Sequence, residues 1–483
     1  MVIENRRVQM QKAGKIFFAP AYIAGVVLLL NLFFSTWVYD DPFITYRYAE
    51  NLRRGLGFVY NADERVLSTT TPLFTILLAL SGNIYSDLPR LAGLLGMTAL
   101  AAGGLFLWDL ARTWNAPMAG WGALLLYPGF PLLVSTLGSE TPLYLAFCLG
   151  AFAFYAHRHY PLTAVFAALS VLTRPDGILI GLTLAIHHFV QDRRRISWMS
   201  LAVFLGLTLP WFIFAWIYFG SPLPVTLAAK QQQGAMEISR KFISGLPGIF
   251  MFYDWRPYLL TAGLALAGLF FTFRRAGSWA LLLCWTVLYF LVYSLLGVSG
   301  YFWYYAPLVP GLIALAGLGV SSMLKNALRS FHFITLSMIF IALVASQVYQ
   351  LRQLSKHQYR NLKMNNLMGL YRVAGRWLEE HTPPQATVGT LEVGIIGYYC
   401  QRPMVDFTGL IQPEVGKKLT RYGTYEDSAI WAVEHYRPDY LVLFEDQFPR
   451  LEQDYAARHC EAVQTFLGNS LEHPINLIVY SCR

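Results

Sequence analysis

The chain has 483 residues, of which 55% are hydrophobic and only 13% are charged, and its mean hydropathy is +0.42. No soluble domain of this size needs so large an apolar fraction, so the composition predicts a polytopic membrane protein. The formal net charge is +9, but the basic residues stand in short clusters between apolar runs. That pattern sets membrane topology, and it excludes a nucleic-acid-binding surface as the source of the charge.

The first apolar run covers residues 16 to 38 and follows a basic segment that contains Arg6 and Arg7. The run is not followed by the small-residue cleavage site of a signal peptide, so we expect a retained first span. Basic residues mark the cytoplasmic ends of membrane helices. The N-terminus is therefore predicted to be cytoplasmic, and the first span is predicted to reach the outer side at Asp40.

Two adjacent carboxylates, Asp40 and Asp41, follow this span. Pro42 suits the first position of a new helix, and Asp41 suits its N-cap. Apolar and basic residues fall on separate faces of the next three turns, up to Arg54, which predicts a helix lying flat on the membrane with a basic rim facing anionic groups. A simpler interpretation stays open, in which Asp41 only caps the helix and Asp40 is only solvated.

The later apolar runs predict about eleven spans in all, each of which needs roughly 20 residues. Residues 71 to 85 are too short, so we expect a shallow or re-entrant outer helix there. Residues 161 to 190 predict a hairpin of two short helices that returns to the basic run Arg193 to Arg195, the strongest cytoplasmic signal in the chain. A long outer loop, residues 220 to 256, carries Lys230.

Charged side chains recur at the predicted outer ends of the spans. Ionisable groups near hydrocarbon are costly and usually face a cavity or a partner, so we expect these residues to converge on the outer half of the bundle. They are Asp40, Asp41, Glu140, Arg174, Asp176 and Lys230. The simpler alternatives are that Arg174 and Asp176 only neutralise each other, and that Glu140 is a solvated loop carboxylate.

The chain changes character after residue 351, which predicts a transmembrane domain over residues 1 to 351 and an α/β domain over residues 352 to 483 on the outer side. Apolar runs of strand length there alternate with helical patterns. The strands are expected at residues 387 to 393, 440 to 444 and 477 to 480, and the helices near residues 364 to 381 and 425 to 436.

Three cysteines lie in this last part: Cys400, Cys460 and Cys482. An outer location is oxidising, so these cysteines can pair. If the segment before the last strand folds back as a hairpin, Cys460 and Cys482 would be joined. Pairing of Cys400 with Cys460, or three free thiols, also remains open, because sequence does not determine connectivity.

The first outer loop resembles that of a branch of the GT-C superfamily which includes the mycobacterial terminal arabinofuranosyltransferase. The matching blocks are Asp40 to Ala49, Gly55 to Asn61 and Glu64 to Val66. Further matching pieces follow in the same order: Thr71-Pro72-Leu73, Gly138 to Leu143, Leu172 to Gly177, Leu223 to Thr226 with Lys230, and Val405 to Leu410. The pair Val225-Thr226 departs from the pattern, since relatives more often have Asn-Thr there.

The resemblance implies an α-helical polytopic enzyme of the cell membrane. Such enzymes transfer a sugar from a polyprenyl-phosphate donor on the outer leaflet to a glycan, lipid or protein acceptor, with inversion; the sugar would be arabinofuranose or another pentose or hexose. By position in the motifs, the general base is Asp40 or Asp41, and the residues that bind the donor phosphate are Arg47, Arg174 and Lys230. Glu140 and Asp176 would orient the acceptor, and Glu140 could hold a divalent cation together with Asp40 and Asp41.

Two other classes of function compete with this one. A transporter or lipid flippase usually carries its carboxylates near mid-membrane, on broken helices within repeated halves, whereas here they cluster at one face and no repeat is visible. A non-catalytic scaffold could instead bind envelope glycans through the C-terminal domain. Retention of the cellular phenotype after replacement of Asp40 and Asp41 would favour the scaffold.

Overall fold

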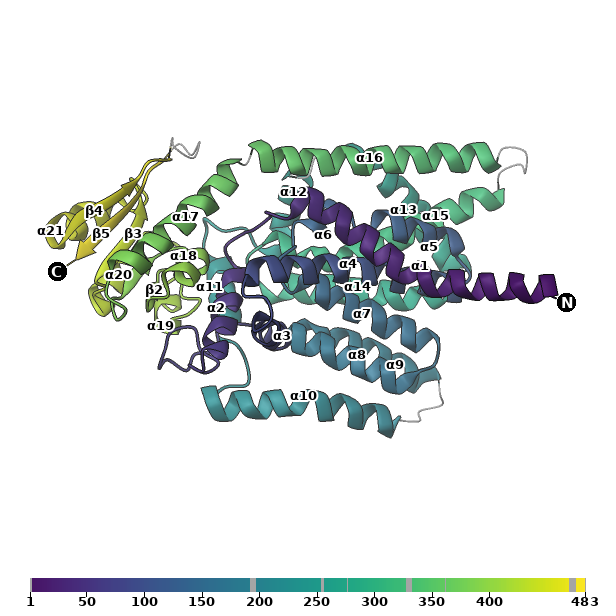
Figure 1. Ribbon diagram of the computed structural model, residues 1–483, viewed down its shortest axis with the longest axis horizontal. Helices are drawn as coiled ribbons and strands as arrows, with labels where there is room; N and C mark the ends of the chain where they lie inside the picture. The colour runs from purple at the N-terminus through teal and green to yellow at the C-terminus, as the bar shows by residue number, and fades with distance from the viewer. Residues whose placement is uncertain are drawn as a thin grey trace.

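The computed structural model shows a long body of helices with a small α/β layer at one end (Figure 1). The N-terminus lies at the far end of the helical body, and the sheet that contains the C-terminal strands lies at the other. The run Arg193 to Arg195 falls outside the described residues. The described ranges are 2–191, 197–252, 256–275, 277–326, 332–360, 362–468 and 475–482.

Most of the long helices run along the body in the same general direction (Figure 1). Six apolar helical segments among the described residues are long enough to cross a membrane, so the protein is a helical multi-pass membrane protein. The total number of spans, about eleven, stays a prediction. The helices of the body are α1 (Val2–Phe34), α4 (Leu88–Thr113), α5 (Pro117–Leu126), α6 (Pro131–Val134), α7 (Thr141–Ala156), α8 (Tyr160–Thr173), α9 (Ile178–Gln191), α10 (Trp198–Phe219), α13 (Leu259–Arg275), α14 (Gly277–Leu296), α15 (Val309–Asn326) and α16 (His332–Arg360).

The predicted short elements are present. The helix α3 (Pro72–Gly82) has only 11 residues, and the helices α8 and α9 form the predicted hairpin around a single 3-10 turn, Pro175–Gly177. The apolar run from residue 118 to 136, which is long enough for one of the predicted spans, is not one continuous helix. It breaks between α5 and α6, where Pro128 lacks the backbone N–H that a continuing helix needs.

The helix α2 (Pro42–Arg53) begins at Pro42, as expected, but it does not lie on a surface. Ten of its 12 residues are buried, and it packs beside α3 and against α18 (Val393–Cys400) of the C-terminal part. The prediction that this helix lies flat on the membrane with a basic rim is therefore wrong. Its amphipathic pattern is hidden because the C-terminal part covers the face that was assigned to water.

The C-terminal part contains a five-stranded sheet with the order β2-β1-β3-β5-β4. The strand β1 is parallel to β2 and β3, whereas β5 is antiparallel to β3 and β4. The helices α17 (Leu362–His381) and α18 pack on one face, and α20 (Tyr425–Tyr436) packs on the other. The strands are β1 (Val388–Thr390), β2 (Met404–Asp406), β3 (Tyr440–Phe444), β4 (Cys460–Phe466) and β5 (Leu477–Cys482). The strand β2 was not predicted, and β4 was considered only as a segment that folds back on the last strand.

The strands β4 and β5 form the hairpin that was expected from the cysteine spacing. Cys460 lies opposite Cys482 in the antiparallel register, and the two are joined by a disulfide. Cys400 is a buried free thiol on α18. The pairing of Cys460 with Cys482 is therefore confirmed over the two alternatives.

The boundary at residue 351 stays a prediction, because α16 continues across it without a break.

Candidate active site

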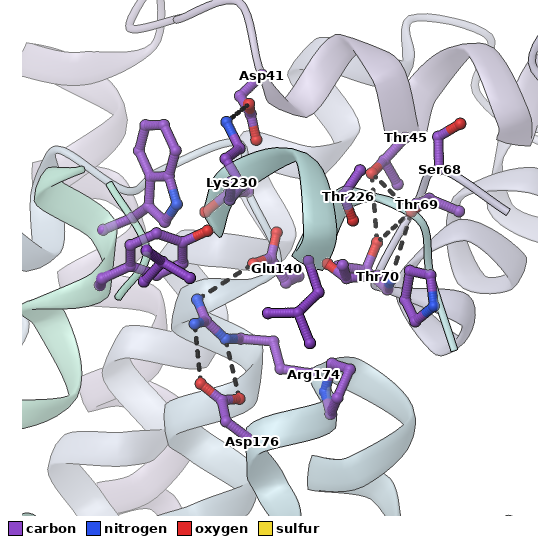
Figure 2. Close-up of a pocket in the computed structure, with 18 of the residues that line it drawn as sticks. Asp41, Thr45, Ser68, Thr69, Thr70, Glu140, Arg174, Asp176, Thr226 and Lys230 are labelled. Atoms are coloured by element: carbon purple, nitrogen blue, oxygen red, sulfur yellow. Dashed lines mark hydrogen bonds and ion pairs between the residues drawn. The ribbon is translucent and has the colours of Figure 1, made fainter. Parts of the chain in front are cut away.

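A cavity of about 300 Å³ lies where the helical body meets the C-terminal part, and Figure 2 shows residues that line it. Its walls come from the starts of α2, α3 and α7, the turn between α8 and α9, the helix α11 (Thr226–Ala235), and the segment between α14 and α15. Leu410 is the contribution of the C-terminal part. Five residues predicted for the site line this cavity: Asp41, Glu140, Arg174, Asp176 and Lys230.

Lys230 contacts both a carboxylate and an aromatic ring, and Figure 2 shows its contact with the carboxylate of Asp41. Its Nζ atom is 3.4 Å from Oδ1 of Asp41 and 4.0 Å from the ring centroid of Tyr301. Burial alone would lower the pKa of the Lys230 amine, but the Asp41 carboxylate outweighs it and holds that pKa above its usual value. Gly234 allows α11 to approach the backbone at Gly297, where a Cβ atom would not fit, and this contact positions Lys230.

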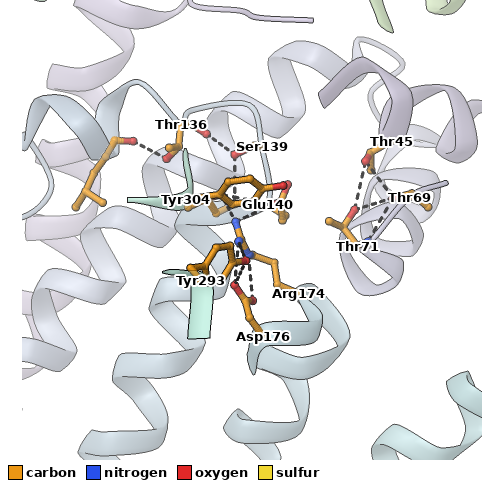
Figure 3. Close-up of polar contacts among 12 residues, drawn as sticks. Thr45, Thr69, Thr71, Thr136, Ser139, Glu140, Arg174, Asp176, Tyr293 and Tyr304 are labelled. Atoms are coloured by element: carbon orange, nitrogen blue, oxygen red, sulfur yellow. Dashed lines mark hydrogen bonds and ion pairs between the residues drawn. The ribbon is translucent and has the colours of Figure 1, made fainter. Parts of the chain in front are cut away.

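Arg174 is held in a second charged group (Figures 2 and 3). Because Pro175 follows it, Arg174 leaves the helical conformation at the end of α8 and adopts an extended backbone. Its Nε and Nη2 atoms donate to both carboxylate oxygens of Asp176, at 3.2 and 2.9 Å, and Nη2 also donates to the Tyr293 hydroxyl. Its Nη1 atom is 3.4 Å from Oε1 of Glu140.

Burial and neighbouring charges act against each other on the pKa values of Glu140 and Arg174. Burial raises the pKa of the Glu140 carboxyl, and the nearby guanidinium of Arg174 only partly offsets that rise. Burial would lower the pKa of Arg174, but Asp176 holds it well above its usual value. Arg174 therefore stays a cation.

Hydroxyl and aromatic side chains complete the walls, and the sequence reasoning missed them. The hydroxyls of Thr45, Thr69 and Thr71 lie 3.0 to 3.3 Å apart and form one buried group facing the cavity (Figure 3). The run of four hydroxyl residues from Ser68 to Thr71 was the available signal for it. The aromatic run from Tyr301 to Tyr305 was the signal for the opposite wall, which includes Trp303 and Tyr304.

Asp40 does not line the cavity. Its two carboxylate oxygens accept the backbone N–H groups of Gly394 and Ile395, at 2.9 and 2.7 Å, and so cap the start of α18. Asp41 occupies the N-cap position of α2, but its side chain makes no capping bond. The predicted N-cap position of Asp41 is confirmed, but its side chain turns to Lys230 and does not cap α2, whereas Asp40 caps a helix more than 350 residues away in sequence.

Arg47 also lies away from the cavity. Its side chain is buried, and its guanidinium donates to the backbone carbonyls of Tyr60, Gly397 and Arg402 at 3.3, 2.7 and 3.3 Å. The structure thus does not bring Arg47 to the predicted phosphate site, because its donors join the first loop to α18 and the residues that follow it.

The three carboxylates considered for a divalent cation do not converge. Asp40 turns toward α18, whereas Asp41 and Glu140 contact Lys230 and Arg174. Among the residues that the structure describes, no group of three or more His, Cys, Asp or Glu side chains could hold a metal ion. The arrangement does not fit the expected cation.

Residues 352–480 match the model of a domain of unknown function, DUF8728. The chain is also 30% identical over 265 residues to the terminal β-(1→2)-arabinofuranosyltransferase of Mycobacterium tuberculosis. That match covers 48% of this chain and 40% of the relative, so the chain spans less than half the length of that protein.

Two solved structures are similar over nearly the whole chain. The crystal structure of ArnT from Cupriavidus metallidurans bound to undecaprenyl phosphate has a TM-score of 0.62 at 16% identity, and the likeness covers 95% of this chain and 97% of ArnT. The archaeal oligosaccharyltransferase AglB from Archaeoglobus fulgidus, in complex with an inhibitory peptide and a dolichol phosphate, has a TM-score of 0.57 at 13% identity, with 89% and 69% covered. The protein therefore shares the fold of ArnT and AglB, which is the GT-C fold.

Proposed function

We propose that the protein is a membrane glycosyltransferase that moves a sugar from a polyprenyl-phosphate donor to a hydroxyl of a cell-envelope acceptor. The observation that carries this proposal is one cavity that combines two cations, Arg174 and Lys230, with an accessible carboxylate, Asp41. The structures of ArnT and AglB, which share the fold, contain undecaprenyl phosphate and a dolichol phosphate, respectively. The cavity would open on the outer side of the cell membrane, with the N-terminus inside and residues 352 to 483 outside.

The proposed reaction assigns the base to Asp41 rather than to Asp40. Asp41 lines the cavity and its side chain is 40% exposed, whereas both carboxylate oxygens of Asp40 accept hydrogen bonds from backbone N–H groups. As the acceptor oxygen attacks the anomeric carbon, its proton passes to the Asp41 carboxylate. The bond from the anomeric carbon to the phosphate oxygen breaks, and the electron pair leaves with the phosphate, where Lys230 and Arg174 stabilise the charge.

The remaining polar groups suit the sugar and the acceptor. The hydroxyls of Thr45, Thr69 and Thr71 can both donate and accept hydrogen bonds, as sugar hydroxyls require. Glu140 and Asp176 orient the Arg174 guanidinium and, with it, the bound substrates. The hydrophobic residues among them shield these contacts from water and so strengthen them.

Comparison of the envelope glycans and lipids of a deletion strain with those of its parent would identify the missing sugar and the accumulated acceptor. Complementation with Asp41→Asn should fail to restore the product. Asp63→Asn is the matched control, since Asp63 is an exposed carboxylate of the same first loop that does not line the cavity. Full restoration by Asp41→Asn would refute the assignment of the base, and accumulation of an untranslocated donor would favour the flippase alternative.

A further inference from the structure

The cavity holds more negative than positive charge before any substrate enters. Its lining includes three carboxylates, on Asp41, Glu140 and Asp176, against the two cations Arg174 and Lys230. Arg174 is bound to both oxygens of Asp176 and is also within reach of Glu140. An incoming phosphate therefore needs a cation that can change partners.

Lys230 has the geometry for such a change. Its contact with Asp41, at 3.4 Å, is longer than the 2.7 to 2.9 Å of a tight charge-assisted hydrogen bond. Its side chain is only 8% exposed, against 40% for Asp41, so the ammonium stays enclosed while the carboxylate is free to turn. The contact is thus one that the carboxylate can leave without exposing the ammonium to water.

An aromatic stack holds the ammonium from the other side. Lys230 Nζ lies 4.0 Å from the ring centroid of Tyr301, which stacks on Trp303 with centroids 4.6 Å apart, and Trp303 stacks in turn on Tyr39. A cation–π contact of this kind attracts an ammonium without using its hydrogen-bond donors. When Asp41 leaves, Lys230 therefore keeps its place and has N–H groups to offer to a phosphate.

The proposed reaction transfers one negative charge from Asp41 to the leaving phosphate, and both groups lie next to Lys230. Before the reaction, Asp41 carries one negative charge and the donor phosphodiester carries another. Afterwards, the acceptor proton has neutralised Asp41, and the freed polyprenyl monophosphate carries close to two. The charge thus shifts from the base to the leaving group as one bond forms at the anomeric carbon and one breaks.

We propose that Lys230 is a shared counter-ion, which pairs with Asp41 until that carboxylate takes the proton and then pairs with the leaving phosphate. The proposal rests on the proposed function above and deepens it. Proton transfer and departure of the phosphate are then coupled through one ammonium, and Lys230 is paired with a negative group at both stages. It also implies that the empty enzyme, in which Asp41 holds Lys230, binds a monophosphate less tightly than an enzyme whose Asp41 is neutral.

The test is a binding cycle with undecaprenyl phosphate and the full-length protein purified in detergent. Asp41→Asn imitates the protonated base, so it should tighten binding about fivefold to tenfold, a coupling typical of neighbouring charged groups. Lys230→Met should weaken binding, and in the Lys230→Met background Asp41→Asn should change the Kd by less than about twofold. Glu237→Gln is the control, because it removes an exposed carboxylate that pairs with Arg421 and does not line the cavity.

Three outcomes would overturn the inference. If Asp41→Asn tightens binding equally in the presence and absence of Lys230, the effect is one of overall charge. If Asp41→Asn leaves the Kd unchanged while Lys230→Met weakens binding, Lys230 still binds the phosphate and the proposed function stands without the shared counter-ion. If the wild-type protein does not bind undecaprenyl phosphate, the proposed donor class fails as well. Should Lys230→Met not fold, Lys230→Arg keeps the charge and must retain the tightening by Asp41→Asn.

Discussion

Replacement of Arg47 can distinguish two roles for this residue, binding of the donor phosphate and joining of two parts of the fold. Its guanidinium makes one short bond, to the carbonyl of Gly397 at 2.7 Å, and two longer ones, to Tyr60 and Arg402 at 3.3 Å. A hydrogen bond to a charged group contributes about 1.5 to 3 kcal/mol, and longer ones contribute less. Taking about 2 kcal/mol for the short bond and about 0.5 kcal/mol for each of the others, we expect Arg47→Met to cost roughly 3 kcal/mol.

The loss should appear first at the joint between the helical body and the C-terminal part. Thermal unfolding of the purified variant should begin at lower temperature than in the wild type, and limited proteolysis should reach residues 382 to 412 sooner. Arg54→Met is the control, because Arg54 lies at the C-terminal end of α2, its side chain is exposed, and its partner Glu50 keeps a second salt bridge to Arg53 when Arg54 is replaced. Undecaprenyl phosphate should still bind to the folded fraction of Arg47→Met. Wild-type stability together with lost binding would refute this reasoning and restore Arg47 to the phosphate site.

Three further predictions follow from the same geometry. Asp41→Asn should lower turnover by roughly a hundredfold with little change in thermal stability, as loss of a general base does. Asp40→Asn should instead lower thermal stability more than it lowers turnover, and the reverse result for the two variants would exchange their roles. Burial raises the pKa of Asp40 and also that of Glu392, which occupies the N-cap position of α18. The folded state therefore binds more protons than the unfolded state, so the free energy of unfolding should fall as pH rises from the ordinary carboxyl range through the raised pKa values. Thermal unfolding from pH 4 to 9 should show this slope, and Glu392→Gln should reduce it. Replacing Cys460 and Cys482 by serine should cost about 3 kcal/mol on the loop-entropy model and expose β4 to proteases, while an unchanged protease pattern would show that the hairpin holds without the bond.

Local features of the sequence determined the class of the protein and the places where many elements begin. The apolar fraction requires a membrane, and a proline begins α2, α3 and the 3-10 turn after Arg174 because its missing N–H and restricted φ favour that position. The class and the helix starts depend on composition and on contacts within a turn, so the sequence alone is sufficient to predict them. The cysteine spacing only proposed Cys460–Cys482 among open alternatives, and the register of the β4–β5 hairpin decided it.

Only the tertiary structure separated Asp40 from Asp41 and removed Arg47 from the cavity. The two aspartates are adjacent and chemically identical, and they differ because α18 approaches one and α11 approaches the other. The approach of α18 depends on Gly394, where a Cβ atom would meet the backbone and side chain of Asp40. An amphipathic pattern shows that a helix has a polar face but not whether water, lipid or another segment covers it. That choice is made by packing between residues hundreds of positions apart, and this packing assigns each charged side chain either to the cavity or to the joint.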